Sequence, residues 1–221
     1  MDYIVEHTAR KKITLIIERD NSLIVRAPFQ ATQDELDNFI KRKRVWLYKK
    51  LAEKKYMNFT ETKKQFVNGE WFLYLGRSYK LVLVDEQDVP LRFVHNTFRL
   101  RKDCIGKWED YFIAWYIQKA TDKIVDRLNY YQKKIWRTGI WWWVKDLQYR
   151  RWSCTPSNKL YFHWKVILAP WDIIDYIVAH ELVHVVEKKH TKKYWDMLAI
   201  VMPWYEKYKE WLKKHWGDLV L

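Results

Sequence analysis

The sequence is poor in the residues that mark several common classes of protein. Its two cysteines, Cys104 and Cys154, are too few for a disulfide framework and favour a reducing compartment. No stretch approaches the roughly 20 consecutive apolar residues that span a bilayer. The opening residues, MDYIVEHTARKKITL, lack the apolar run and the cleavage site of a signal peptide. These absences predict a globular, cytoplasmic protein that does not enter a membrane.

Acidic residues are also scarce, with 27 Asp and Glu against 41 Lys and Arg, and the formal net charge is +14. Such an excess favours polyanions such as nucleic acid or nucleotides, and it equally suits a lysine-rich surface that keeps a protein soluble. The one dense basic cluster is KRKRVWLYKKLAEKK at 41–55, most simply the solvated face of a helix. Contact with nucleic acid therefore stays an open expectation, and the chain is expected to be a monomer.

The N-terminal half combines short strand patterns with one helix. Residues 13–28 alternate as a β-hairpin hinged on Asp20-Asn21-Ser22. Thr32 and Glu35 form a capping box, which opens a helix that ends near Tyr56. Three further strand patterns follow, at 65–76, 79–84 and 91–101.

From Trp108 the pattern changes to helical spacing. Apolar residues recur every fourth position and predict a long helix over 108–134, with a buried face of Phe112, Tyr116, Ala120, Ile124 and Leu128. Strand patterns at 140–150 and 160–168 precede Ala169-Pro170, which starts the next helix. Two short helices are expected at 191–200 and after Pro203. The chain thus reads as α+β, with an antiparallel β-rich region at 1–106 and a region at 107–221 in which a helix packs on a small sheet.

The stretch HELVHVVEKKH (180–190) has the spacing of a metal site. His180 and His184 lie one turn apart on the same face of a helix, so two imidazoles can meet one ion. Glu181 projects about 100° around the helix, from where its carboxylate can reach a water on that ion. A catalytic zinc needs a third protein ligand. Spacing alone leaves two candidates for it, His190 and Glu187.

The plain alternative is a pair of helical histidines that only pack or face solvent. Against it, the rest of this helix is apolar, which predicts burial nearly all round. Buried histidines and a buried carboxylate must be satisfied, and a metal ion does so. We therefore expect a metal site here.

The motif continues as DYIVAHELVHVVEKKHTKKYW (175–195) and MPWY (202–205). This pattern resembles the YgjP-like metallopeptidase-domain family, relatives of the SprT-like zincins. The segments VRAP (25–28), GEWFLYLGRSYKL (69–81) and FHWKVILAP (162–170) extend the resemblance over essentially the whole chain. The resemblance implies a zincin-like fold for 107–221.

The resemblance also implies roles for single residues. His180, His184 and His190 match the family's Zn²⁺ ligands and Glu181 its general base, which leaves Glu187 beside the site. Tyr205 matches the tyrosine of the family's M-P-x-Y motif. Its phenol could stabilise an oxyanion, and packing is an equal alternative.

Three further residues or groups near the motif are open to two interpretations. Asp175 could orient a ligand imidazole, or it could cap a helix or face solvent. Cys154 could be a fourth ligand, but a closed site would leave Glu181 no water to activate, so an inert thiol is favoured. Trp141–Trp143 is expected to pack in the core or on a sheet face rather than to stack on bases.

The chain departs from the family pattern at two points. RRWSC replaces R-W-G-S-C, so Arg151 and Trp152 stand where the family has Trp and Gly, which puts a tight turn there in question. His163 stands where the family usually has Asn.

These features predict a zinc-dependent hydrolase with a peptide or protein substrate. An edge strand at 159–166 is expected to bind the peptide by strand addition. Two alternatives stay open. One is a hydrolase of nucleoside triphosphates, since the motif does not choose the bond. The other is a nucleic-acid-associated module that binds through its basic surface.

Overall fold

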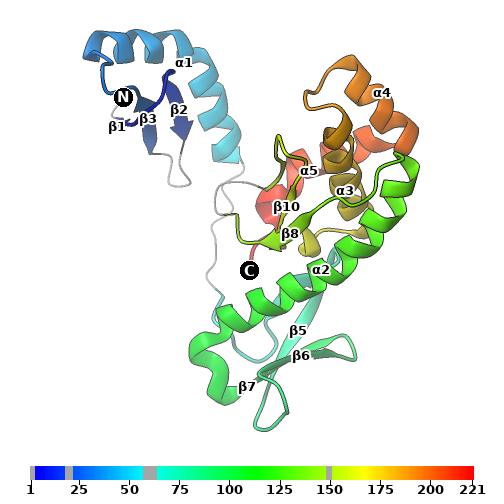
Figure 1. Ribbon diagram of the computed structural model, residues 1–221. Coiled ribbons are helices and arrows are strands. Elements are labelled where there is room, and N and C mark those ends of the chain that lie inside the picture. Colours follow the sequence, from blue (N-terminus) through cyan, green and yellow to red (C-terminus); the bar gives the residue numbers. More distant parts are fainter. Residues whose placement is uncertain (1–2, 18–21, 57–63, 148–150) are drawn as a thin grey trace. The chain divides into compact units, whose positions relative to one another are not determined.

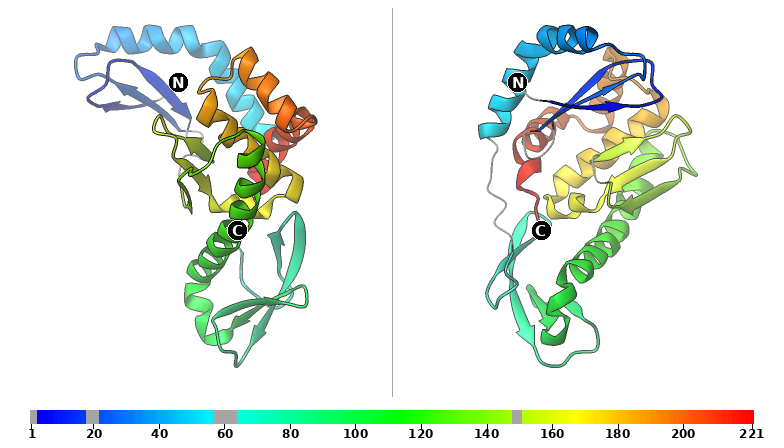
Figure 2. Two further views of the ribbon diagram at one scale, coloured as in Figure 1. Left: turned by 45° about the vertical axis from the view of Figure 1, so that its right-hand side comes forward. Right: turned by 90° about the vertical axis from the view of Figure 1, so that its left-hand side faces the viewer.

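The computed structural model describes residues 3–17, 22–56, 64–147 and 151–221 (Figures 1 and 2). Three small sheets and five α-helices occur in these residues, which confirms the α+β class. The chain forms two compact units, Met1–Thr60 and Glu61–Leu221. The boundary predicted at 106–107 falls inside the second unit, at the end of a short 3-10 helix, η1 (Lys102–Lys107).

The first unit holds a three-stranded sheet and one helix. Strands β2 (Thr14–Ile17) and β3 (Leu23–Ala27) form the predicted antiparallel hairpin. Its hinge at Asp20-Asn21 lies outside the described residues. A third strand, β1 (Ile4–His7), pairs with β3 in parallel.

Helix α1 (Gln33–Tyr56) begins at the predicted capping box. The backbone N–H of Thr32 donates to Glu35 Oε2 at 3.0 Å, and the N–H of Glu35 donates to Thr32 Oγ1 at 3.4 Å. Leu36 from this helix joins a small core with Val25 and Ala27 from β3. Residues 41–44 of the basic cluster are exposed, as a solvated face requires.

The second unit begins with a four-stranded sheet in the order β4-β5-β7-β6. Its strands are β4 (Trp71–Tyr74), β5 (Arg77–Val84), β6 (Leu91–Val94) and β7 (Thr97–Arg101). The segment 91–101, predicted as one strand, is a hairpin because His95 and Asn96 both adopt positive φ and reverse the chain. Strands β5 and β7 pair in parallel, so the N-terminal half is not purely antiparallel.

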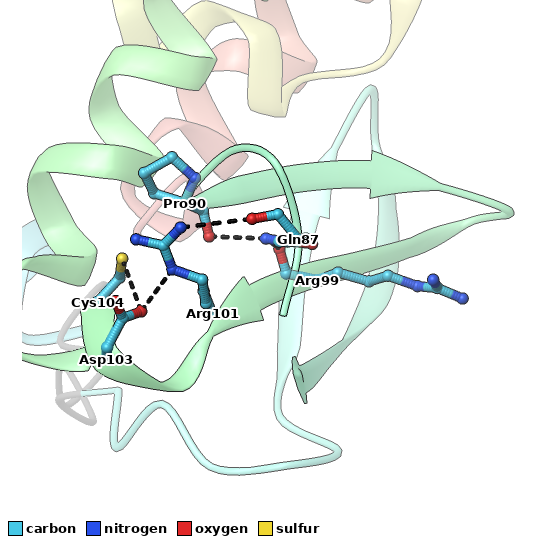
Figure 3. A network of polar contacts seen from close by, with 6 residues as sticks. All are labelled: Gln87, Pro90, Arg99, Arg101, Asp103 and Cys104. Carbon is cyan, nitrogen blue, oxygen red and sulfur yellow. Dashed lines mark hydrogen bonds and ion pairs between the residues drawn. The ribbon is translucent and has the colours of Figure 1, made fainter. Parts of the chain in front are cut away.

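A polar network ties the loop between β5 and β6 to the end of β7 (Figure 3). Gln87 Nε2 donates to the carbonyls of Pro90 and Arg99 at 2.8 and 3.0 Å. Arg101 in turn donates to the carbonyl of Gln87 and, at 2.6 Å, to Asp103. These bonds hold the corner where the chain leaves the sheet and enters the long helix.

Helix α2 (Trp108–Lys134) joins the two parts of the second unit. The five residues predicted to form its inner face are all buried: Phe112, Tyr116, Ala120, Ile124 and Leu128. Helix α2 (green) runs from the four-stranded sheet to the later helix that holds His180 and His184, as Figures 1 and 2 show. One continuous core therefore spans this unit.

The third sheet has the order β8-β10-β9. Strand β10 (Leu160–His163) pairs in parallel with β8 (Trp142–Lys145) and antiparallel with β9 (Trp152–Cys154). The strand predicted over 160–168 stops at His163, whose Nδ1 accepts the N–H of Lys165 at 3.1 Å and caps a 3-10 helix, η2 (Trp164–Leu168). Trp152, which stands where the family has glycine, is an ordinary strand residue of β9.

The C-terminal part is helical. It consists of α3 (Trp171–Val186), α4 (Lys192–Val201), α5 (Tyr205–His215) and a last 3-10 turn, η3 (Trp216–Asp218). Among the described helices, none is long and apolar enough to cross a membrane.

The start of α3 is fixed by the first hairpin of the second unit. The N–H groups of Leu75 and Gly76 donate to the carbonyls of Ile167 and Leu168, each at 2.9 Å. Gly76 has φ +74°, and a Cβ built on it would lie 2.7 Å from Pro170 Cγ. Only glycine combines this backbone with this close approach, so Gly76 sets where α3 begins.

Candidate metal centre

Helix α3 is buried along most of its length, as its apolar sequence predicts. It ends at Val186, because Glu187 is already extended. The chain then turns back to Thr191, whose hydroxyl accepts the N–H of Tyr194 and caps α4. This reversal brings His190 next to the histidines of α3.

The three motif histidines converge on one point. Nε2 of His190 lies 3.1 Å from Nε2 of His184 and 3.2 Å from Nε2 of His180. Among the described residues, these three histidines form a group whose potential ligand atoms all lie within 4.8 Å of one another, close enough to share an ion. Glu187 is not in this group, and His190 is exposed, which leaves the centre open to solvent on that side.

All three imidazoles are held in the neutral form that binds metals. Burial lowers the pKa of His180 to about 3, and it also lowers the pKa values of His184 and His190. Nδ1 of His184 lies 3.1 Å from the carbonyl of Glu187. A carbonyl only accepts, so Nδ1 carries the proton and the lone pair of Nε2 faces the centre.

These donors fit a metal ion. Ligand nitrogens at 2.0–2.1 Å from a tetrahedral ion are separated by about 3.3 Å. This is close to the 3.1 and 3.2 Å that separate Nε2 of His190 from Nε2 of His184 and of His180. A neutral imidazole carries a single N–H proton, so three Nε2 atoms that face one another cannot all be satisfied by hydrogen bonds between them. A cation at their centre accepts the lone pairs instead. The triad therefore fits a metal site by chemistry and by spacing.

Glu181 lies beside the triad and is only 2% exposed. Its Oε1 is 4.0 Å from Nε2 of His180, and its Oε2 is buried without a hydrogen-bond partner in the described structure. Burial raises the pKa of this carboxyl group to about 8. A buried carboxylate oxygen without a partner is costly, and a water at the centre would satisfy it.

Aromatic side chains hold the histidines in place. Tyr194 donates to the carbonyl of His180 at 3.0 Å, and its ring packs 4.5 Å from His184. Trp195 stacks on His190 at 5.2 Å. None of these contacts was predicted from the sequence. The available signal was Thr191, a good N-cap residue, because a helix that starts there has Tyr194 and Trp195 in its first turn, directly after His190.

Tyr205 stands one ring away from the centre. It stacks on Trp195 at 5.4 Å, and its hydroxyl donates to Glu206 at 3.4 Å. Its ring thus packs, while the role of its hydroxyl in catalysis stays a prediction.

Asp175 does not orient an imidazole. Both of its carboxylate oxygens bind Arg127 of α2, and Tyr131 donates to one of them at 3.2 Å. Tyr176 is the residue that reaches Nδ1 of His180, at 3.4 Å.

Cys154 lies outside the triad, as expected for an inert thiol. Its sulfur accepts a hydrogen bond from Lys188 at 3.3 Å, and burial raises its pKa. Both cysteines are free.

The prediction that the strand at 159–166 is an edge strand is wrong. Strand β10 occupies the middle of its sheet and is paired on both sides. Its central place follows from the short strand β9, which pairs with it on the side away from β8 and which no strand pattern in the sequence indicated.

The model of the YgjP-like metallopeptidase domain matches residues 11–215. The chain belongs to the YgjP-like family. The match spans parts of both units and includes the histidine triad, Glu181 and Tyr205. No curated protein and no solved structure matches the chain. The metallopeptidase domain of this YgjP-like chain thus includes a histidine triad that fits a metal ion.

Proposed function

We propose that this YgjP-like chain is a zinc-dependent peptidase that uses Glu181 as its general base. The observation that supports this most strongly is the buried, unpartnered carboxylate oxygen beside three converging neutral imidazoles. Nitrogen ligands in a set of three, with an open side, suit catalytic zinc. A bound zinc ion supplies Lewis-acid chemistry and lowers the pKa of a water toward about 7.

Glu181 then takes a proton from the attacking water and delivers it to the leaving amine. Its side chain is fixed by the surrounding core, so little reorganisation accompanies the transfer. A positive charge at the triad favours the carboxylate form and counters the effect of burial on its pKa.

Tyr205 is proposed to donate to the oxyanion that forms on the substrate. Burial and the neighbouring Glu206 carboxylate raise the pKa of its phenol, which keeps the proton on at neutral pH. Its bond to Glu206, at 3.4 Å, is long and can be exchanged for a stronger bond to a developing charge.

The peptide is proposed to add to β9. This strand is the edge of its sheet on the side that contacts α3, and β9 pairs only with β10 among the described strands. Main-chain bonds to an edge strand give affinity without selecting a sequence.

Casein hydrolysis by the purified full chain tests the proposal. Glu181→Gln should lower the rate by about 10²–10⁴-fold while metal content stays stoichiometric. The matched control is Glu187→Gln, an acid on the same segment whose side chain lies outside the triad, and it should stay near wild type. Equal activity in both variants, or no metal in the wild type, would contradict the proposal.

One observation favours a second candidate, the hydrolysis of nucleoside triphosphates at the same centre. Lys209 packs over Trp195 at 4.0 Å, and its charge contributes to the lowered pKa values of His180 and His190. A cation this near the triad could bind a phosphate. Phosphate release from a nucleoside triphosphate that is lost in Glu181→Gln and reduced in Lys209→Gln, with no casein hydrolysis, would favour this candidate.

A further inference from the structure

The outer face of the third sheet carries a row of three aromatic rings. Trp141 precedes β8 and Trp143 lies two residues on, so both project to the same face. Tyr161 of β10 is the direct cross-strand partner of Trp143. The ring centroids of Trp141 and Trp143 are 6.2 Å apart, and those of Trp143 and Tyr161 are 5.2 Å apart. Adjacent ring planes differ by only 16° and 17°.

This aromatic row does not belong to the core. Trp141 is 69% exposed and Trp143 is 39% exposed, so of the two expected places, the core and a sheet face, these two tryptophans occupy the sheet face. The opposite face of the sheet serves the core, through buried Leu160 and Phe162 and partly buried Trp142. Contiguous exposed tryptophans are uncommon on a protein surface and mark a place of interaction.

Two lysines flank the aromatic row. Lys145 Nζ lies 4.6 Å from the ring centroid of Tyr161, and Lys159 Nζ lies 6.0 Å from that of Trp143. The nearby acid Asp146 lies 3.4 Å from His163. The face therefore combines parallel aromatic rings with positive charge, on a chain whose net charge is +14.

We propose that this face binds single-stranded nucleic acid. Bases of a single strand stack with parallel planes, and aromatic side chains of matching orientation extend that stack. The lysines supply the complementary charge for the phosphates that follow the bases. A neutral oligosaccharide could also stack on tryptophan but would have no use for the lysines, and a duplex keeps its base faces covered.

The proposed strand-binding face is distinct from the metal centre. Strand β9 is the edge strand that packs on α3, β8 forms the other edge of the sheet, and the aromatic row lies on the face of the sheet opposite the buried side chains. Binding there does not rest on the proposed hydrolase and survives its failure.

Fluorescence anisotropy with a labelled oligodeoxythymidylate of about 15 nucleotides tests the proposal on the full chain. We expect Trp141→Ala with Trp143→Ala to weaken binding by at least about tenfold, since each change removes a ring on which a base stacks. The matched control is Trp136→Ala, because Trp136 is 91% exposed and lies outside the row. It should change the affinity less than about twofold. Circular dichroism and metal content report whether each variant is folded.

The salt dependence separates the lysines from the rings. Lys145→Gln with Lys159→Gln should reduce the slope of log affinity against log salt by about 1.4, or about 0.7 for each lost phosphate contact. The tryptophan variant should keep the slope and lose affinity at every salt concentration.

Three competitors decide between ligands. A single strand should displace the probe better than heparin, a duplex of equal length or a neutral cello-oligosaccharide. Binding that the tryptophan changes leave intact would overturn the proposal. So would equal competition by heparin, preference for the duplex, or tryptophan-dependent binding of the neutral glycan.

Discussion

The hydroxyl of Tyr176 lies 3.4 Å from Nδ1 of His180, one turn further along α3. The opposite nitrogen of the same imidazole faces His190. Tyr176 is buried, and burial raises the pKa of its phenol, so the hydroxyl keeps its proton at neutral pH. The pair fixes the rotation of the imidazole from the side away from the metal centre.

Tyr176→Phe should therefore weaken metal affinity by about 10–100-fold, the usual effect of losing a group that orients a ligand. Competition with a chromophoric chelator measures it. Tyr208→Phe is the control, since Tyr208 packs against Tyr176 without reaching a histidine. If both variants bind metal as tightly as wild type, Tyr176 does not orient His180.

His190→Ala should abolish stoichiometric metal binding, whereas Glu187→Ala should preserve it. Among the described residues, the His190 nitrogen is the third donor atom close enough to His180 and His184 to share an ion with them. Elemental analysis after gel filtration gives the stoichiometry. Chelation should also lower the thermal midpoint of the wild type, because an ion bound only to the folded state stabilises it. Loss of metal in Glu187→Ala would assign the third ligand differently.

Gly76→Ala should destabilise the protein more than Gly139→Ala. Both glycines have positive φ, which costs alanine about 1 kcal/mol. Gly139 has open space around its Cα, while a Cβ on Gly76 meets Pro170 and adds an overpacking cost of about 1–3 kcal/mol. Urea unfolding measures the difference. Equal losses would show that the hairpin yields easily to the added methyl group.

Arg127→Leu should lower the free energy of unfolding by about 1.5–3 kcal/mol. The change leaves the mostly buried Asp175 carboxylate with Tyr131 as its remaining described partner. Arg92→Leu removes an exposed pair with Asp88 and should cost no more than about 0.5 kcal/mol. A similar small loss in both variants would mean that the α2–α3 ion pair contributes little.

Local features were predictable from the sequence because each depends on residues close together in the chain. The capping box at Thr32 and the buried face of α2 both depend on side chains three or four residues apart, which the helical repeat brings together. So does the meeting of His180 and His184. The same spacing placed Glu181 beside the ion site. What sequence spacing left open was the third ligand, because His190 lies beyond the end of α3.

Contacts between distant residues were not predictable in this way. Asp175 pairs with Arg127, 48 residues earlier, and nothing in its own neighbourhood indicates that partner. Strand β10 has the pattern of any short apolar strand, and its central place depends on β8 and β9 arriving on both sides.

The sequence by itself determined the helix that holds two histidines and a carboxylate, since helical periodicity fixes which side chains share a face. The family motif implied His190 as the third ligand, but only the tertiary structure brings it to the other two histidines, through the reversal after Val186 and the capping of α4. Tertiary packing also left Oε2 of Glu181 without a hydrogen-bond partner among the described residues. It placed Trp141 and Trp143 on the outside, since the buried face of their sheet was already filled by Leu160, Phe162 and the helices packed on them.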